Sequence, residues 1–208
     1  MQTKVIISLL SLVLVIGVGW FFWSRGASIK NVPLRETGPI LFFGDSLVAG
    51  VGATSGHDLP TVLSEAVGEP VLNFGVAGDT TRQALTRVTA AQAVHPRLVL
   101  ILLGGNDFLQ RVPRDETFAN LQSLIAAFQS DGAAVVLIGV RSGIIGGGAD
   151  DRYQTLARAT GALYIEDALQ GVFGDPALMS DTIHPNDAGY RKISDRIAPA
   201  VESIIHAR

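Results

Sequence analysis

The sequence predicts an α/β fold, a three-layer α/β/α sandwich around a five-stranded parallel flavodoxin-like sheet, preceded by one N-terminal transmembrane helix. Two observations lead to this prediction. From Pro39 onward, short apolar runs alternate with amphipathic stretches of helix length, as in repeated βα units. The chain has 208 residues, of which 48% are hydrophobic, enough for one domain with one large core.

Residues 1–26 are predicted to be a hydrophobic membrane anchor or signal segment. Val5–Trp23 carries no charge, and at about 1.5 Å per residue it is long enough for a hydrocarbon core of about 30 Å. The run ends in the aromatic cluster Trp20–Trp23, which is typical of a membrane interface rather than of a cleavage site, and this favours an uncleaved anchor. A cleaved segment would instead give a secreted protein.

The orientation of this segment is not decided by its flanking charges, because positive charges lie on both sides of it. A very short N-terminal tail before a large domain favours export of the domain to the periplasm or the cell exterior. Residues 27–38 are polar, contain Pro33, and are predicted to form a linker. Residues 39–208 then form the globular domain.

The composition limits the classes of partner and site. A formal net charge of -3 gives no electrostatic reason to expect nucleic acid as a partner. The chain has no cysteine, which excludes disulfides, thiolate metal sites and a cysteine nucleophile.

Each apolar run in the domain is short enough to be a buried strand, and the stretches between the runs show helical periodicity. In flavodoxin-like order 2-1-3-4-5, the loops after the first three strands converge on one crevice. The strands are predicted at Ile40–Phe43, Val71–Phe74, Leu98–Leu103, Ala134–Val140 and Ala162–Ile165, and the helices at Asp58–Val67, Thr80–Ala93, Asp115–Ser130, Asp150–Thr160 and Pro185–His206.

The first strand ends abruptly in Gly44-Asp45-Ser46, which places the Ser46 hydroxyl at the carboxyl edge of the sheet. With a base beside it, a hydroxyl in that position becomes a nucleophile. The simpler structural alternative is that Asp45 or Ser46 caps a helix.

Glycine-rich loops also follow the second and third strands, at Gly75–Thr81 and Gly104–Asp107. Glycine lets the backbone approach a ligand closely, so both loops can aim N–H groups into the crevice. The structural alternatives are a helix N-terminus capped by Asp79 or Thr80 and a plain turn.

Asp181 and His184 lie three positions apart, just before the last predicted helix. A carboxylate there can accept a hydrogen bond from one imidazole nitrogen and leave the other facing the crevice. The alternative is a capped turn followed by a surface histidine ahead of Pro185. The other histidines have no comparable neighbours in the sequence and are interpreted as surface residues: His57, His95 and His206.

Taken together and in this order, the motifs resemble the blocks of the SGNH (GDSL) hydrolase family, nearest to its acyl-CoA thioesterase I, lysophospholipase and arylesterase-like branch. The resemblance implies that Ser46 is the nucleophile, His184 the general base and then acid, and Asp181 the residue that orients the histidine. It further implies that Gly78 and Asn106 join the backbone N–H of Ser46 in binding the oxyanion. The motifs are Gly44-Asp45-Ser46-Leu47, Gly78 in Ala-Gly-Asp-Thr, Gly104-Gly105-Asn106-Asp107 and Asp181-Thr182-Ile183-His184-Pro185.

The activity implied by this resemblance is that of a serine esterase that cleaves carboxylic ester or thioester bonds through an acyl-serine intermediate, without metal or cofactor. The expected substrates are small-molecule or lipid esters, and the expected membrane contact is the N-terminal segment. Substrate contacts are predicted for Asp45, for Phe108 with Leu109 on an apolar wall, and for Ile144 and Ile145 in the loop after the fourth strand. The alternative for the two isoleucines is a surface loop.

Three rival functions remain open at this point. They are a carbohydrate O-acetylesterase, a catalytically silent acyl-binding module of the same fold, and a flavodoxin-like nucleotide or flavin binder that uses residues 78–81. Ser46 does not lie in a Gly-x-Ser-x-Gly motif, which speaks against the α/β-hydrolase fold. Gly50–Ser55 lacks the spacing of a dinucleotide fingerprint.

Overall fold

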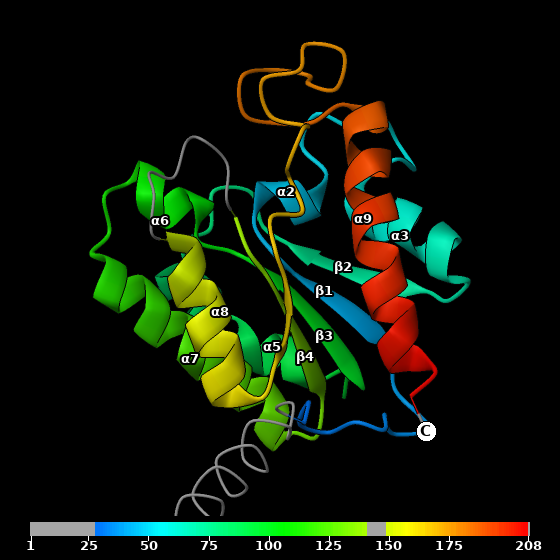
Figure 1. The fold of residues 1–208 in the computed structure, drawn as a ribbon, viewed down its shortest axis with the longest axis vertical. Coiled ribbons are helices and arrows are strands. Elements are labelled where there is room, and N and C mark those ends of the chain that lie inside the picture. Colours follow the sequence, from blue (N-terminus) through cyan, green and yellow to red (C-terminus); the bar gives the residue numbers. More distant parts are fainter. Residues whose placement is uncertain (1–27, 141–148, 208) are drawn as a thin grey trace, which may run out of the picture.

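The computed structural model describes residues 28–140 and 149–207. It contains a five-stranded parallel sheet with the order β2-β1-β3-β4-β5, which confirms the predicted topology (Figure 1). The strands are β1 Ile40–Gly44, β2 Val71–Gly75, β3 Leu98–Leu102, β4 Ala134–Ile138 and β5 Leu163–Ile165.

Two parts of the sequence prediction lie outside the described residues. They are the apolar segment Val5–Trp23 and the pair Ile144 and Ile145. Among the residues that the structure describes, no helix is both long enough and apolar enough to cross a membrane.

The three central strands are buried at every position, whereas the edge strands β2 and β5 are partly exposed. Their continuous apolar sequences fit this environment, because helices cover both faces of a parallel sheet. Successive side chains of a strand point to opposite faces, so Phe42 joins one hydrophobic cluster and Phe43 the other. The sheet therefore separates two cores.

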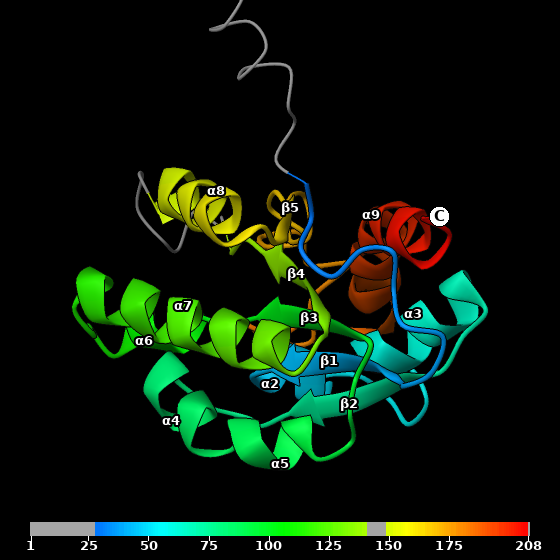
Figure 2. The ribbon, with the colours of Figure 1, turned by 90° about the horizontal axis from the view of Figure 1, so that it is seen from below.

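Two groups of helices cover these cores, as Figure 2 shows from below. Helices α2, α3 and α9 pack on the Phe42 face, and α4, α5, α7 and α8 on the Phe43 face. A further short helix, α6, follows β3 at the carboxyl edge of the sheet. The bounds are α2 Ser46–Ala49, α3 Leu59–Val67, α4 Thr81–Thr86, α5 Val88–Gln92, α6 Gly105–Leu109, α7 Arg114–Ser130, α8 Ala149–Thr160 and α9 Asp187–Ile205.

The helix predicted over 80–93 is interrupted at Arg87, which ends α4 and precedes α5. Thr80 begins α4 with a capping box that includes Gln83. The last helix begins at Asp187 rather than at Pro185, because the Asn186 side chain accepts a hydrogen bond from Gly189 N and so caps the first turn. A side-chain hydrogen bond therefore sets the start of α9, whereas at Arg87 backbone hydrogen bonds close α4 and α5 begins without a side-chain cap.

Residues 28–38, part of the predicted linker, follow the amino edge of the sheet. Lys30 N donates to Gly161 O at 2.8 Å, and Asn31 Nδ2 donates to Ala133 O at 2.8 Å. Arg35 donates to the carbonyls of Asp131 and Pro96. These partners lie just before or beside the starts of β3, β4 and β5, so this segment lies at the edge of the sheet opposite to α2, which begins with Ser46 (Figure 1).

Candidate active site

The structure brings together Ser46, His184 and Asp181 from opposite ends of the domain sequence. His184 Nε2 lies 3.1 Å from Ser46 Oγ across a separation of 138 positions. His184 Nδ1 lies 2.8 Å from Asp181 Oδ2. A carboxylate can only accept hydrogen bonds, so Nδ1 carries the proton and Nε2 is free to accept from the serine hydroxyl.

Asp181 is held as an ionised acceptor. Its carboxylate accepts hydrogen bonds from the His184 ring and from the backbone N–H groups of His184 and Ile183. These bonds lower the pKa of Asp181 to about 2, and the imidazole bond has the largest effect. Asp181 is therefore negative throughout the neutral range. It also caps the turn before His184, as the alternative interpretation of this motif predicted.

Ser46 is placed by the abrupt change from β1 to α2. Asp45 is the N-cap of α2, and its Oδ1 accepts a hydrogen bond from Leu47 N at 3.0 Å. Ser46 is thus the first helical residue, directly beyond the carboxyl end of a buried strand. The structure therefore confirms that Asp45 caps a helix, and this local structure is compatible with the prediction that Ser46 is a nucleophile.

Gly78 and Asn106 lie on the loops after β2 and β3. Gly78 has a φ of +86°, and no heavy atom lies within 4 Å of the place where a Cβ would stand, so its backbone is open to solvent. Asn106 Nδ2 donates to Asp79 O at 3.0 Å and lies 3.4 Å from Asp45 Oδ2. Asn106 thereby links the loops that follow β1 and β2.

Asp45, which the sequence suggested as a substrate contact, is only 4% exposed. Burial raises its pKa to about 7; the Leu47 N–H opposes this rise, and the carboxylates of Asp79 and Asp107 add to it. Such burial does not fit direct contact with a substrate. The carboxyl instead lies between Leu47 N and Asn106 Nδ2, both of which donate hydrogen bonds to it.

Arg87 connects the first two loops and was missed by the sequence analysis. Its guanidinium donates to Asp79 Oδ2 at 2.6 Å, to Phe74 O and to Gly44 O at 2.7 Å, and it lies 4.1 Å from the centre of the Phe43 ring. No local pattern marks this arginine, since its partners lie as far as 43 positions away.

Asp107 connects the second and third loops from a buried position. Its carboxylate accepts hydrogen bonds from Thr81 N at 2.8 Å, from Thr81 Oγ1 at 2.5 Å and from Thr117 Oγ1 at 3.2 Å. These bonds fasten the start of α4 to α6 and α7. Asp107, a polar residue of a predicted motif, therefore has a structural role: it holds two loops together.

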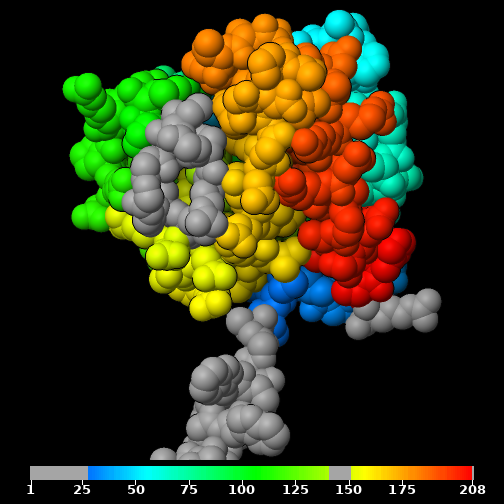
Figure 3. All heavy atoms as spheres, turned by 45° about the horizontal axis from the view of Figure 1, so that its top comes forward, coloured from blue at the N-terminus to red at the C-terminus, as the bar shows by residue number. Residues whose placement is uncertain are grey.

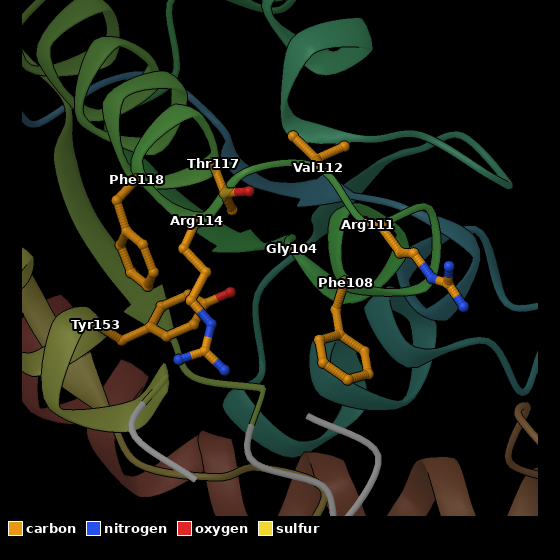
Figure 4. A pocket seen from close by; sticks show the side chains of 8 residues that line it. All are labelled: Gly104, Phe108, Arg111, Val112, Arg114, Thr117, Phe118 and Tyr153. Carbon is orange, nitrogen blue, oxygen red and sulfur yellow. The ribbon is translucent and has the colours of Figure 1, made fainter. Parts of the chain in front are cut away.

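A cavity of about 170 Å³ lies beside α6, and Figure 4 shows its lining. Phe108, which the sequence suggested for an apolar wall, lines it, and Leu109 is half exposed on the same helix. Tyr153 reaches the cavity from α8 and donates to Leu103 O at 2.7 Å. The lining residues are Gly104, Phe108, Arg111, Val112, Arg114, Thr117, Phe118 and Tyr153.

His57 has neighbours that the sequence did not reveal. Its Nδ1 lies 3.1 Å from Thr54 Oγ1 and 3.9 Å from an oxygen of Asp187, although the ring is exposed as predicted. Within the described ranges, no three His, Asp or Glu side chains come together as metal ligands would.

Comparisons with known proteins relate the chain to lipases and acylhydrolases. A family model described as "GDSL-like Lipase/Acylhydrolase family" matches residues 42–192. Esterase TesA of Pseudomonas aeruginosa is 28% identical over 181 residues, 80% of this chain and 89% of that protein. Thioesterase 1/protease 1/lysophospholipase L1 of Escherichia coli K12 is 28% identical over 176 residues, 80% and 85% of the two chains. A crystal structure of TesA superposes with a TM-score of 0.75 at 27% identity, covering 80% of this chain and 99% of that one.

Proposed function

Because the chain belongs to the GDSL-like lipase/acylhydrolase family and is an ester-hydrolysing enzyme of the SGNH type, we propose that Ser46, His184 and Asp181 are its catalytic triad. The observation that supports this proposal most directly is the chain of two hydrogen bonds, 3.1 Å and 2.8 Å long, from the serine through the imidazole to the carboxylate. The carboxylate of Asp181 is ionised, as its role of orienting the imidazole requires.

In the proposed reaction, Ser46 Oγ attacks the carbonyl carbon of an ester or thioester while its proton passes to His184 Nε2. The tetrahedral intermediate collapses, the imidazolium gives the proton to the departing alcohol or thiol, and an acyl-serine remains. Water, deprotonated by His184, then attacks the acyl carbon; the bond from this carbon to Ser46 Oγ breaks, the imidazolium returns the proton to Oγ, and the acid product leaves. Asp181 stays ionised and stabilises the imidazolium in both steps.

The negative oxygen of the tetrahedral intermediate is proposed to bind the backbone N–H groups of Ser46 and Gly78 and the side-chain amide of Asn106. Asn106 Nδ2 uses one hydrogen for Asp79 O at 3.0 Å. It donates the second hydrogen to Asp45 Oδ2 at 3.4 Å, a long and therefore weak bond that a bond to the oxyanion would replace.

For the acyl group we propose the cavity beside α6. Phe108, Val112, Phe118 and Tyr153 supply apolar surface there, and α6 carries both Asn106 and Phe108. Such a cavity favours acyl groups longer than acetyl, because burial of each additional methylene contributes about 0.8 kcal/mol.

The test compares the purified wild type with Ser46→Ala on p-nitrophenyl esters from acetyl to palmitoyl, one acyl-CoA and one lysophospholipid. Ser46→Ala is expected to lower kcat by about 10⁴-fold or more and to abolish labelling by a fluorophosphonate. Ser123→Ala, which removes an exposed hydroxyl of α7, is the control and keeps full activity. Full hydrolysis by Ser46→Ala would refute the mechanism, and absence of labelling in the wild type would favour the silent binding module.

The same ester series tests the acyl cavity. A rate maximum above acetyl is expected, whereas a maximum at acetyl, together with release of acetate from acetylated sugars, would favour the carbohydrate O-acetylesterase.

We further propose that residues 1–26 anchor the exported domain in a membrane, with its candidate active site facing away from that membrane. The apolar sequence of Val5–Trp23 supports an anchor. Residues 30–35 bind the amino edge of the sheet, and Ser46 lies beyond its carboxyl edge. This arrangement favours esters that reach the enzyme from the aqueous side.

A further inference from the structure

We propose that Thr54 and Asp187 are positioning residues that hold His184 within reach of Ser46. They join the α2–α3 loop, residues 50–58, to the first turn of α9. The proposal rests on the catalytic role proposed above for His184.

Both oxygens of Asp187 are used in this contact. Thr54 N donates to Asp187 Oδ1 at 2.7 Å, and Thr54 Oγ1 donates to Asp187 Oδ2 at 2.6 Å, across 133 positions of sequence. These hydrogen bonds lower the pKa of Asp187, so the carboxylate is ionised at neutral pH. Bonds of this length to an ionised acceptor are among the stronger ones in proteins.

A second contact fastens the beginning of the same loop. Tyr190 is fully buried, and its hydroxyl donates to Val51 O at 2.7 Å. Tyr190 and Asp187 lie one turn apart on α9. Two side chains of one helix therefore hold the loop at two points, Val51 and Thr54.

Between these two points, the loop backbone lies directly against the residues around His184. Gly52 has a φ of +93°, and a Cβ there would stand 2.5 Å from Pro185 O and 3.1 Å from His184 Cβ. Only glycine permits both this conformation and this approach. In Figure 3, the cyan part of the chain lies beside the orange part, which agrees with this approach.

The geometric consequence concerns the distance between nucleophile and base. The α2–α3 loop follows α2, whose first residue is Ser46, and Asp187 follows His184 by three positions. Asp181 orients the imidazole ring through Nδ1. The Thr54–Asp187 contact ties the segment that carries the base to the segment that carries the nucleophile, so it controls how the ring stands relative to Ser46 Oγ.

The test uses Thr54→Val, which removes the hydroxyl while nearly keeping the side-chain shape, Asp187→Ala, and the double variant in the full-length chain. Each single change is expected to lower kcat on a p-nitrophenyl ester by about 10- to 100-fold with little change in KM, because misplacement of a reacting group by about 1 Å costs this much. The rate of fluorophosphonate labelling falls by the same factor. Thr54→Ser keeps the hydroxyl, so its kcat and its rate of labelling are expected to equal those of the wild type.

The double variant is expected to be no slower than the slower single variant, because the two residues act as a pair. Glu65→Ala is the matched control: it removes an exposed carboxylate that also contacts α9, through Arg191, and it leaves kcat unchanged. Asp187 is the first residue of α9, so Asp187→Ala can disturb that helix. Thr54→Val leaves α9 unchanged and therefore tests the contact independently.

Wild-type kcat and labelling in Thr54→Val, multiplicative losses in the double variant, or a Thr54→Ser variant as slow as Thr54→Val would overturn the proposal. These results differ from failure of the proposed function, in which the wild type itself hydrolyses no ester and takes up no label.

Discussion

At the scale of single residues, the buried carboxyl of Asp45 differs most from an ordinary side chain of its kind. It is 4% exposed and lies between Leu47 N and Asn106 Nδ2, directly before Ser46 in the sequence. Burial raises its pKa to about 7, so the folded protein keeps a proton on Asp45 under conditions in which the unfolded chain has lost it.

This difference predicts a specific pH dependence of stability. Between about pH 4 and the folded pKa of about 7, the folded state binds one more proton than the unfolded state, so the free energy of unfolding falls as pH rises, by about 1.4 kcal/mol per pH unit. Asp45→Asn is neutral in both states and lacks this contribution. Urea unfolding of both proteins at pH 5, 6, 7 and 8 measures the difference between their free energies of unfolding. From pH 5 to pH 7 the wild type is expected to lose stability steadily relative to the variant, and above pH 7 the difference is expected to level off. A constant difference would contradict the prediction.

At the scale of secondary-structure elements, the candidate site depends on very short helices placed directly after strands. Helix α2 begins two residues after the end of β1, and α6 begins three residues after the end of β3. Arg87 and Asp107 then bond the loops to one another, so Ser46 and Asn106 are held by neighbouring loops as well as by their own helices.

The contribution of α6 is tested by Asn106→Ala. Loss of one oxyanion donor is expected to lower kcat by about 10²- to 10³-fold, or roughly 3 to 4 kcal/mol of transition-state stabilisation, with a smaller effect on KM. Asn120→Ala serves as the control, because it removes a side-chain amide that donates to Thr81 Oγ1 in the same network. Steady-state kinetics on one p-nitrophenyl ester decide the matter, and an unchanged kcat would remove Asn106 from the proposed oxyanion site.

At the scale of the whole molecule, the sheet gives the domain two different edges. Ser46, Gly78, Asn106 and His184 lie beyond the carboxyl edge, where parallel α/β sheets commonly bind ligands. The segment 28–38 binds the amino edge. An N-terminal anchor would therefore leave the candidate site open to the aqueous side.

The anchor is tested by fractionating cells that express the full chain. We expect the protein in the membrane fraction, resistant to a carbonate wash and released by detergent, because Val5–Trp23 is long enough to span the bilayer. Leu14→Arg is expected to reduce membrane retention, since a central arginine costs about 2.5 to 3.5 kcal/mol on insertion, whereas Leu14→Ala is the control. Full-length wild-type protein in the soluble fraction would contradict the proposal.

Much of the fold could be predicted because its signals are local. The runs Ile40–Phe43 and Leu98–Leu103 are continuously apolar, which is how strands buried on both faces appear in a sequence. The interruption at Arg87 and the short helix α6 escaped prediction, because helices of five or six residues are too short to show a helical periodicity. The start of the last helix at Asp187 escaped prediction because the Asn186 side chain, rather than periodicity, sets it.

The sequence by itself determined the alternation of strands and helices, which follows from hydrophobic periodicity and can be read within a few residues. The order of the strands was inferred from the fold class that this alternation predicts, and Ser46, Asp181 and His184 were chosen as candidate catalytic residues because the set of short motifs resembles the SGNH family. Only the tertiary structure decided that Asp45 is buried, that Arg87 joins two loops, and that Thr54 meets Asp187. The physical reason is that these contacts span as many as 133 positions, and packing of the sheet and its helices alone brings such distant segments together.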